Sequence, residues 1–412
     1  MQNHKFTIII PTRERVNTLY WAIKTCLNQD YDNLEVIISD NFSFDNTREV
    51  VAEFLSDKRV KYINTGKRIS MSHNWEFALN HVHEGFVSIL GDDDGFLPNS
   101  ITQINTILNE YNSLAIGWMC PHYRWPDFGF GRSNMLSVHL EDIKIQELNA
   151  QKELLGILDL KNKNTLHGIL PSLYRNFVHI DAIKKVKAKT NSFFLSQIPD
   201  YYAGIALSAV IDNFLYCSRP FAISGGSGRS NGASHSNQHI DPTELNLFNN
   251  EGNIPYHKSF AKTYTNSVFS AECYLQAQDL FSKDFFKVDF IDIISDSLRE
   301  TKPDPSPRYD YVIDKLFEMA AINGIPKNML EDEIAKFPNK PINDKYDRII
   351  EGYNVFKNRI DVDASKYKVT NVYEATLLYE KIYGSRNSYI RWYKSIIPTI
   401  LLLKREFERK YL

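Results

Sequence analysis

The first 120 residues alternate between short apolar runs and stretches with helical spacing, and this alternation constrains the fold more than any other feature of the chain. Stretches such as 15–29 and 71–83 repeat apolar residues every three to four positions. The apolar runs between such stretches are FTIII, LEVIIS, VKYIN, FVSIL and LAIGWMC, beginning at residues 6, 34, 60, 86 and 114. Strands that alternate with helices form βαβ units, so the pattern predicts an α/β fold with a mostly parallel, doubly wound sheet.

The second half of the chain has a different pattern. Residues 121–235 mix Pro, Gly and aromatic residues, with helical spacing at 150–160 and 200–211. From about residue 254, helical spacing with charged residues dominates. A chain of 412 residues is also too long for one ordinary core. We therefore expect two domains, residues 1–250 and a mainly helical domain over residues 251–412.

Composition excludes several classes of protein. The formal net charge is −2, which argues against a nucleic-acid-binding surface and so against a nucleic-acid partner. The four cysteines have no C-x-x-C spacing, so neither a zinc ribbon nor a thioredoxin-like motif is indicated. No apolar run approaches the 18 or so residues of a membrane span, and the first residues do not read as a signal peptide. We therefore expect a cytoplasmic protein.

An acidic triplet is the strongest chemical signal in the sequence. Asp92, Asp93 and Asp94 lie between Gly91 and Gly95, directly after a predicted strand. Active groups of α/β sheets gather at the carboxyl ends of the strands. Three adjacent carboxylates repel one another, so a bound cation is a natural reason to keep them, and oxygen ligands suit Mg²⁺ or Mn²⁺. The alternative is a solvated acidic turn.

Polar residues also follow the first two predicted strands. PTRER occupies residues 11–15, and Asp40 ends the second strand. A carboxylate at that position can accept hydrogen bonds from ribose hydroxyls, although a turn residue or helix cap is the alternative. Neither G-x-G-x-x-G nor G-x-x-x-x-G-K-[ST] follows the first strand, so dinucleotide-binding and P-loop folds are disfavoured.

Taken together, four segments resemble the family 2 glycosyltransferases, inverting enzymes of the GT-A type that are common in bacterial surface-polysaccharide synthesis. The segments are FTIIIPTRER, IISDNFSFDNT, GKRISMSHNWEFALNHVHEGFVSIL and ILGDDDGFLP. The resemblance covers residues 5–120 well and residues 165–235 more loosely. It implies a GT-A nucleotide-sugar-binding fold in which residues 1–120 form the nucleotide-binding half and residues 121–250 the acceptor half with a lid loop.

The resemblance also implies roles for particular residues. In this family the acidic element is the metal-binding DxD motif; Asp92 and Asp94 have that spacing, while Asp93 and Asp94 remain an alternative pair. The residues expected to line the nucleoside pocket are Pro11, Thr12, Arg13 and Asp40, with Arg68 and Asn74 near the nucleotide or its sugar.

An inverting transferase needs a base that deprotonates the acceptor hydroxyl. The resemblance indicates Asp200, in SQIPDYYAG, because family members have an acidic residue at the start of a helix in a similar context. The first turn of a helix stabilises an ionised carboxylate. An ordinary acidic residue opening a helix is the alternative, and Asp181 and Glu153 are weaker candidates for the base.

The loop 224–237 is rich in Ser and Gly and is a candidate lid over the donor diphosphate. Arg229 is its candidate phosphate contact and His235 a candidate metal ligand alongside Asp92 and Asp94. A plain linker is the alternative.

These features predict metal-dependent transfer of a sugar from a nucleotide-sugar, expected to be a UDP-sugar, to a hydroxyl of a glycan or lipid-linked glycan. The cofactor would be Mn²⁺ or Mg²⁺, and the product a lipopolysaccharide, capsule or other surface polysaccharide. A sugar nucleotidyltransferase is one alternative, although PTRERVNTL lacks the glycines expected after its first strand. A catalytically inactive carbohydrate-binding or scaffold protein is the other.

The last residues suggest a peripheral membrane contact. Residues 387–412 carry six basic and two acidic side chains around the short apolar run IIPTILLL. Clustered Lys and Arg are attracted to anionic lipid, so we expect this segment to dock at the inner face of the plasma membrane without crossing it. Packing against the helical domain, or in a homo-oligomer, is the alternative.

Overall fold

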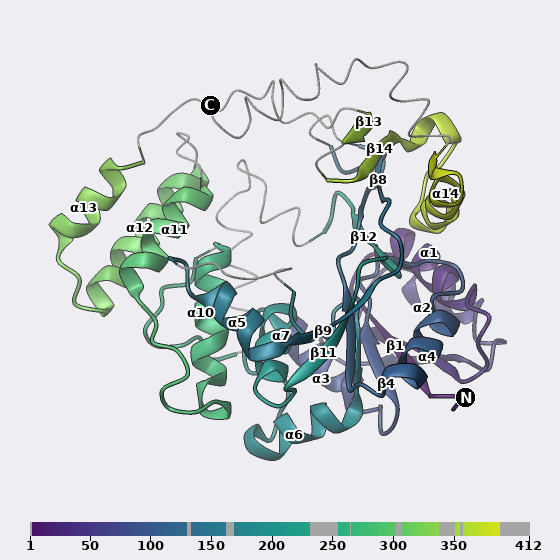
Figure 1. The fold of residues 1–412 in the computed structure, drawn as a ribbon, viewed down its shortest axis with the longest axis horizontal. Helices are drawn as coiled ribbons and strands as arrows, with labels where there is room; N and C mark the ends of the chain where they lie inside the picture. Colours follow the sequence, from purple (N-terminus) through teal and green to yellow (C-terminus); the bar gives the residue numbers. More distant parts are fainter. Residues whose placement is uncertain are drawn as a thin grey trace.

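The computed structural model describes residues 2–129, 133–161, 169–230, 254–263, 265–301, 307–337, 351–354 and 357–387. An eight-stranded sheet in the order β3-β2-β1-β4-β10-β6-β11-β9 forms the centre of the N-terminal part (Figure 1). Its parallel half consists of β1 (Phe6–Thr12), β2 (Leu34–Asp40), β3 (Val60–Asn64) and β4 (Phe86–Ile89). The other half is mixed and consists of β6 (Ala115–Trp118), β9 (Ile145–Asn149), β10 (Phe177–His179) and β11 (Asn213–Cys217).

Helices cover both faces of this sheet, which explains why β1 is apolar along its length. Ile8 and Ile10 pack in one core with α1 (Val16–Leu27) and α4 (Ser100–Tyr111). Ile9 points to the opposite core, against α3 (Met71–Leu79), α5 (Ala150–Leu158), α6 (Ile180–Thr190) and α7 (Pro199–Ser208). A short helix, α2 (Thr47–Ala52), links β2 to β3. The predicted α/β fold, wound on both sides of the sheet, is confirmed.

A second sheet has the order β13-β14-β8-β7-β12-β5. Four of its strands come from the first 226 residues, namely β5 (Gly95–Phe96), β7 (His122–Arg124), β8 (Met135–His139) and β12 (Ala222–Gly226). The other two, β13 (Gly352–Asn354) and β14 (Arg359–Asp363), come from near the C-terminal end. The chain then continues through a 3₁₀ turn (Ala364–Tyr367) into α14 (Val372–Gly384). Thus a late segment completes a sheet that the early part of the chain begins.

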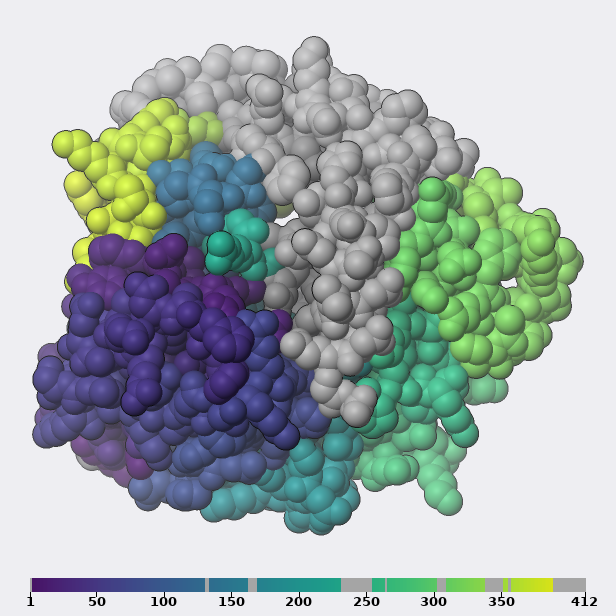
Figure 2. Space-filling view, turned by 180° about the vertical axis from the view of Figure 1, so that it is seen from behind, coloured from purple at the N-terminus to yellow at the C-terminus, as the bar shows by residue number. Residues whose placement is uncertain are grey.

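Helix α14 packs beside α1 and β8, and this contact is visible as the yellow segment bordering the purple one in Figure 2. Between the two contributions to the second sheet lies a helical region. It contains α10 (Asn266–Ala277), a 3₁₀ turn (Gln278–Leu280), α11 (Phe290–Thr301), α12 (Pro307–Ile322) and α13 (Lys327–Ala335). Its core joins Val268, Ile294, Leu316 and Leu330, and α10 also packs against α7.

The predicted, mainly helical C-terminal part is confirmed, while the domain boundary at residue 250 lies outside the described residues and stays a prediction. In the described part of the chain, we find no helix with both the length and the apolar character needed to cross a bilayer. Of the predicted membrane-docking segment, the structure describes Asn387 alone.

Candidate active site

The parallel strands bring the predicted site residues to one edge of the sheet. Thr12 at the end of β1 pairs with Asp40 at the end of β2, and Asp40 pairs with Asn64 at the end of β3. The acidic triplet follows β4, the other neighbour of β1. The carboxyl ends of the four strands therefore meet where α/β sheets hold their active groups.

The acidic triplet is buried rather than solvated, with Asp92, Asp93 and Asp94 exposed to 3%, 4% and 1%. Asp92 accepts hydrogen bonds from Thr12 Oγ1 at 2.8 Å and from Arg15 Nη1 at 3.1 Å. The carboxylates of Asp93 and Asp94 accept instead from serine hydroxyls and a backbone N–H of the glycine-rich strand β12 and the turn after it. A solvated acidic turn, the alternative left open by the sequence, does not describe this burial.

Strand β12 and the following turn close over Asp93 and Asp94. Asp93 Oδ2 accepts from Ser227 Oγ at 2.9 Å and from the Ser230 hydroxyl. Asp94 Oδ1 accepts from the backbone N–H of Gly225 at 2.7 Å. A Cβ atom at Gly225 would lie 1.7 Å from the carbonyl oxygen of Asp93, so only glycine permits this approach. Three residues of the predicted lid loop, Gly225, Ser227 and Ser230, are thus direct partners of the triplet.

Burial dominates the electrostatics of the triplet. It raises the pKa of Asp94 to about 6, with Asp93 adding to the rise and Arg175 opposing it. Burial also raises the pKa of Asp92, against the influence of Arg15. Burial therefore disfavours the ionised form of Asp92 and Asp94, and a cation bound beside them would favour it.

The carboxylate oxygens of the triplet suit a divalent cation, although the triplet does not form a complete ligand shell. Among the described residues, no three Asp, Glu, His or Cys side chains are grouped so that they could hold a metal ion. Mg²⁺ commonly takes one or two carboxylates and completes its shell with substrate phosphates and water. His235, the third predicted ligand, lies outside the described residues.

Asp40 is held rigidly at the predicted nucleoside pocket. Its carboxylate accepts from the Tyr62 hydroxyl at 2.6 Å, from Asn64 Nδ2 at 2.9 Å and from the backbone N–H of Ser43 at 2.9 Å. Pro11 belongs to β1 and Arg13 to the turn after it, and both are half-buried. These contacts hold the Asp40 carboxylate at the carboxyl edge of the sheet.

Arg68 and Asn74 have different surroundings. Arg68 forms an ion pair with Glu14, and its guanidinium carbon lies 4.9 Å from the centre of the Phe44 ring, which is 74% exposed. Asn74 is buried in α3, where its Oδ1 accepts from Ser39 Oγ at 2.7 Å. Arg68 is therefore placed on the rim of the site, whereas the Asn74 amide ties α3 to β2.

Asp200, the candidate base, is the second residue of α7, after Pro199. Burial raises the pKa of Asp200, while the backbone N–H of Tyr201 and the charge of Arg175 oppose the rise. A carboxylate with a raised pKa is a stronger base, which suits proton abstraction. The charge of Arg175, which lies beside Asp94, thus also acts on Asp200.

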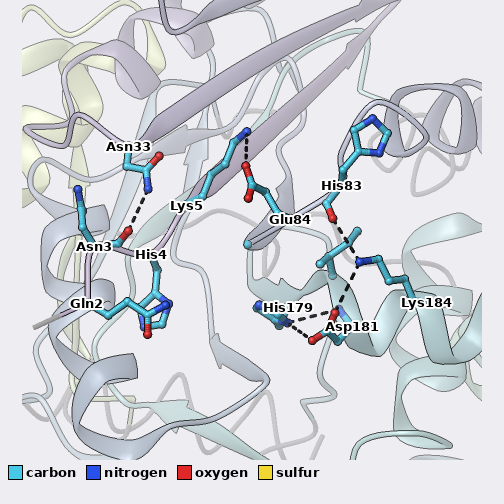
Figure 3. A pocket seen from close by; sticks show the side chains of 12 residues that line it. Gln2, Asn3, His4, Lys5, Asn33, His83, Glu84, His179, Asp181 and Lys184 are labelled. Atoms are coloured by element: carbon cyan, nitrogen blue, oxygen red, sulfur yellow. Dashed lines mark hydrogen bonds and ion pairs between the residues drawn. The ribbon is translucent and has the colours of Figure 1, made fainter.

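The two weaker candidates for the base lie elsewhere. Asp181 lines a cavity of about 380 Å³ with Lys5, which precedes β1, and Glu84, which precedes β4 (Figure 3). That cavity is at the amino ends of the strands, the edge opposite the triplet. Glu153 is buried in α5.

The described part of the candidate lid contacts the loop after β1. Arg229 Nη1 donates to the carbonyl oxygen of Glu14 at 3.2 Å, and the carbonyl oxygen of Arg229 accepts from the Arg15 guanidinium. Residues 231–237 of the predicted lid loop lie outside the described residues.

Tyr174 and Arg175 belong to the site, and the sequence reasoning missed them. The backbone N–H of Ile89 donates to Leu173 O at 2.7 Å, and that of Arg175 donates to Ile89 O at 2.8 Å. These bonds hold the pair beside the end of β4, where Arg175 Nη1 lies 3.7 Å from Asp94 Oδ1. The signal available in the sequence was an arginine within the apolar and aromatic segment ILPSLYRNF.

Comparison with known proteins agrees with this geometry. Residues 7–169 match the family model of glycosyl transferase family 2. This match confirms the predicted resemblance to family 2 over that segment, which is less than half of the chain.

Two relatives have assigned activities. One, from Campylobacter jejuni, is GalNAc(5)-diNAcBac-PP-undecaprenol beta-1,3-glucosyltransferase, 35% identical over 108 residues, which is 26% of this chain and 35% of the relative. The other, from Escherichia coli, is UDP-Glc:alpha-D-GlcNAc-diphosphoundecaprenol beta-1,3-glucosyltransferase, 30% identical over 118 residues, or 28% of this chain and 46% of the relative. The similarity thus spans less than half the length of either relative.

Among solved structures, Staphylococcus aureus TarS residues 1–349, in complex with UDP-GlcNAc, aligns with a TM-score of 0.47 at 13% identity. The alignment covers 81% of this chain and 91% of that one.

Proposed function

We propose that this chain is an inverting, metal-dependent glycosyltransferase that moves a sugar from a UDP-sugar to a hydroxyl of a lipid-linked or polymeric glycan. The observation that carries the proposal is the buried acidic triplet at the carboxyl edge of the sheet, within a segment that matches family 2. The nucleoside would bind along Pro11, Thr12, Arg13 and Asp40, with Arg68 on the rim.

The triplet is the proposed metal centre, with Asp92 and Asp94 as ligands, Asp93 as the alternative to Asp92, and His235 as a further ligand. When bound, Mn²⁺ or Mg²⁺ would neutralise charge on the departing diphosphate. Arg229 and the arginines that already contact the triplet, Arg15 and Arg175, supply further positive charge on the protein's side.

Asp200 is the proposed base, which removes the proton of the acceptor hydroxyl as that oxygen attacks C1 of the donor sugar. The C1–O bond to the diphosphate breaks on the opposite face, so the configuration at C1 inverts. The Escherichia coli relative is named for UDP-Glc and a β-1,3 product. Because glucose is α-linked in UDP-glucose, a β product requires inversion, which supports the same stereochemistry here.

The acceptor class is proposed from the relatives. Both are named for acceptors attached to undecaprenol through a diphosphate. A glycan on such a lipid would be presented at the membrane, as an intermediate in the synthesis of a surface polysaccharide. The predicted docking segment, residues 387–412, fits an acceptor of this kind.

A direct assay tests the proposal. The full chain is mixed with UDP-glucose, UDP-galactose or UDP-N-acetylglucosamine, a diphosphoundecaprenol-linked sugar and Mn²⁺, and UDP release is followed with and without EDTA. We expect acceptor-dependent UDP release that EDTA stops, and a β-linked product by NMR. Asp181→Asn is the matched control for Asp200→Asn, because Asp181 lies at the opposite edge of the sheet.

Other outcomes would identify the alternatives. Pyrophosphate release from UTP and a sugar 1-phosphate would show a nucleotidyltransferase. Sugar binding without release of either product across the donor panel would favour an inactive carbohydrate-binding or scaffold protein.

A further inference from the structure

Arg175 is a largely buried cation beside the triplet. Its side chain is 21% exposed, and Nη1 lies 3.7 Å from Asp94 Oδ1. The guanidinium carbon lies 4.2 Å from the centre of the Tyr174 ring, which fixes one face of the group. An arginine held in this way has lost most of its freedom to swing into solvent.

The backbone at Arg175 is also unusual. Its φ is 62°, in the left-handed region that non-glycine residues rarely adopt. The hydrogen bond to Ile89 O holds this conformation next to the triplet. Left-handed residues that the surrounding structure enforces concentrate at functional sites. The chain therefore keeps a costly conformation at the point where it delivers a positive charge.

That charge acts on groups from two separate elements. Burial favours loss of the proton from Arg175, but Asp94 and, to a smaller extent, Tyr174, Cys120 and Asp200 act to retain it, and the net result is a pKa above the usual arginine value. Arg175 is thus positively charged at every working pH. Asp94, in the turn after β4, is the carboxylate that forms an ion pair with Arg175, while Asp200, in α7, is affected by its charge.

We propose that Arg175 is a positioning residue of this transferase, which holds the Asp94 carboxylate in place and limits how strongly the triplet holds a divalent cation. The proposal rests on the proposed function for the role of Asp94. The reason for the second effect is that Arg175 and a metal ion would share the Asp94 carboxylate. Two cations near one carboxylate repel each other, so the arginine weakens metal binding while it holds the carboxylate in place.

Replacing Arg175 should strengthen Mn²⁺ binding but slow sugar transfer, so two measurements with opposite expected outcomes test the proposal. In Arg175→Gln, Mn²⁺ binding without nucleotide, measured by electron paramagnetic resonance, should tighten about tenfold because the repelling charge is gone. Turnover with UDP-sugar and acceptor should fall at least about tenfold, since misoriented reacting groups reduce the rate strongly. Arg175→Lys keeps the charge and should restore Mn²⁺ affinity to near the wild-type value.

Arg219→Gln is the matched control. Arg219 is also a largely buried arginine, with an ion pair to Glu380 at 2.7 Å and a cation–π contact to Tyr383, but it joins the body of the sheet to α14. This variant should lower the melting temperature and leave Mn²⁺ affinity unchanged. General damage to the fold would therefore not reproduce the tighter Mn²⁺ binding expected of Arg175→Gln.

Unchanged or weaker Mn²⁺ binding in folded Arg175→Gln, or wild-type turnover, would overturn the proposal. Failure of the proposed function has a different signature. If the wild-type chain binds Mn²⁺ but transfers no sugar from any donor, the transferase assignment fails, while the comparison of Mn²⁺ affinities still reports on the charge effect of Arg175.

Discussion

At the scale of the residue, Asp94 combines a structural and a chemical role. Its carboxylate accepts the backbone N–H groups of Gly91 and Gly225, at 3.1 Å and 2.7 Å, and so closes the turn after β4 onto β12. The same group is a candidate metal ligand whose pKa burial raises to about 6. The two roles depend on pH in opposite ways.

The first prediction concerns this pH dependence. Because the folded-state pKa of Asp94 lies above its ordinary value of 3.8, its contribution to stability is full below about pH 4 and is lost as pH rises through about 6. A metal needs the ionised carboxylate. We therefore expect Mn²⁺ to raise the melting temperature clearly at pH 7.5 and little at pH 5, where about one Asp94 in ten is ionised.

Asp94→Ala is the variant that checks this assignment. It should remain folded, lose the Mn²⁺-dependent shift in melting temperature at both pH values, and abolish transfer. Near wild-type turnover of this variant with Mn²⁺ present would show that the metal binds elsewhere.

A second prediction concerns Asp200. Asp200→Asn keeps the size of the side chain but removes its ability to accept a proton, so turnover should fall at least about a hundredfold. Donor affinity, measured by calorimetry with a UDP-sugar, should stay within about threefold of the wild-type value, since the base acts on the acceptor. A structure with donor and acceptor bound that shows the Asp200 carboxylate far from the acceptor hydroxyl would contradict the assignment.

A third prediction concerns Gly225. Gly225→Ala places a methyl group 1.7 Å from the carbonyl oxygen of Asp93, so β12 must move away from the triplet. We expect a loss of about 3 kcal/mol in the free energy of unfolding, at the upper end of overpacking effects, together with weaker Mn²⁺ binding. Denaturant titration measures the first and calorimetry the second. Gly384→Ala, which meets no atom within 4 Å, is the control and should change neither.

At the scale of the element, helix α14 packs against strands from the early part of the chain, which bears on how the domains are organised. Tyr379 in α14 is fully buried, and its hydroxyl donates to the carbonyl oxygen of His139 in β8 at 3.0 Å. The hydrophobic core around Tyr379 also contains Leu136 of β8 and Ile360 of β14. This late helix therefore shares a core with the sheet formed by the early part of the chain.

The fourth prediction follows from that shared core. Tyr379→Ala removes a large buried ring, which costs about 3–5 kcal/mol in comparable cores, and it should increase hydrogen exchange in β8 and β14. Met319→Ala, in the helical core around α12, is the comparison and should act mainly on α10–α13. If Tyr379→Ala left the exchange of β8 unchanged, α14 would not stabilise the N-terminal sheet.

At the scale of the whole molecule, the charge distribution underlies the fifth prediction. The segment 387–412 is strongly basic, although the chain as a whole has a net charge of −2. The full chain should co-sediment with anionic liposomes at low salt, and a chain lacking residues 387–412 should not, because clustered basic residues supply the attraction. Equal binding of both chains, or binding of neither, would indicate that the segment belongs to a core or an oligomer interface.

Local patterns in the sequence determined the parallel half of the sheet and one edge of the site. FTIII and LEVIIS are buried on both faces, so continuous apolar runs marked β1 and β2. Because parallel strands end at a common edge, the polar residues after them, Thr12, Asp40 and Asp92, were predictable as neighbours. The helical spacing at 71–83 likewise marked α3.

Only the tertiary structure decided the contacts between residues far apart in the chain. β10, β12 and β14 read FVH, AISGG and RIDVD, without the longer apolar runs that marked β1 and β2, and their strand character comes from pairing with distant partners. Arg175 reaches Asp94 across 81 positions through an isolated bridge of Tyr174 with Ile89, and β14 pairs with β8 across more than 200. A sequence pattern reports the faces a segment must bury, whereas the choice of partner depends on the packing of the whole chain; for that reason the acidic triplet was evident from the sequence and its arginine at 175 was not.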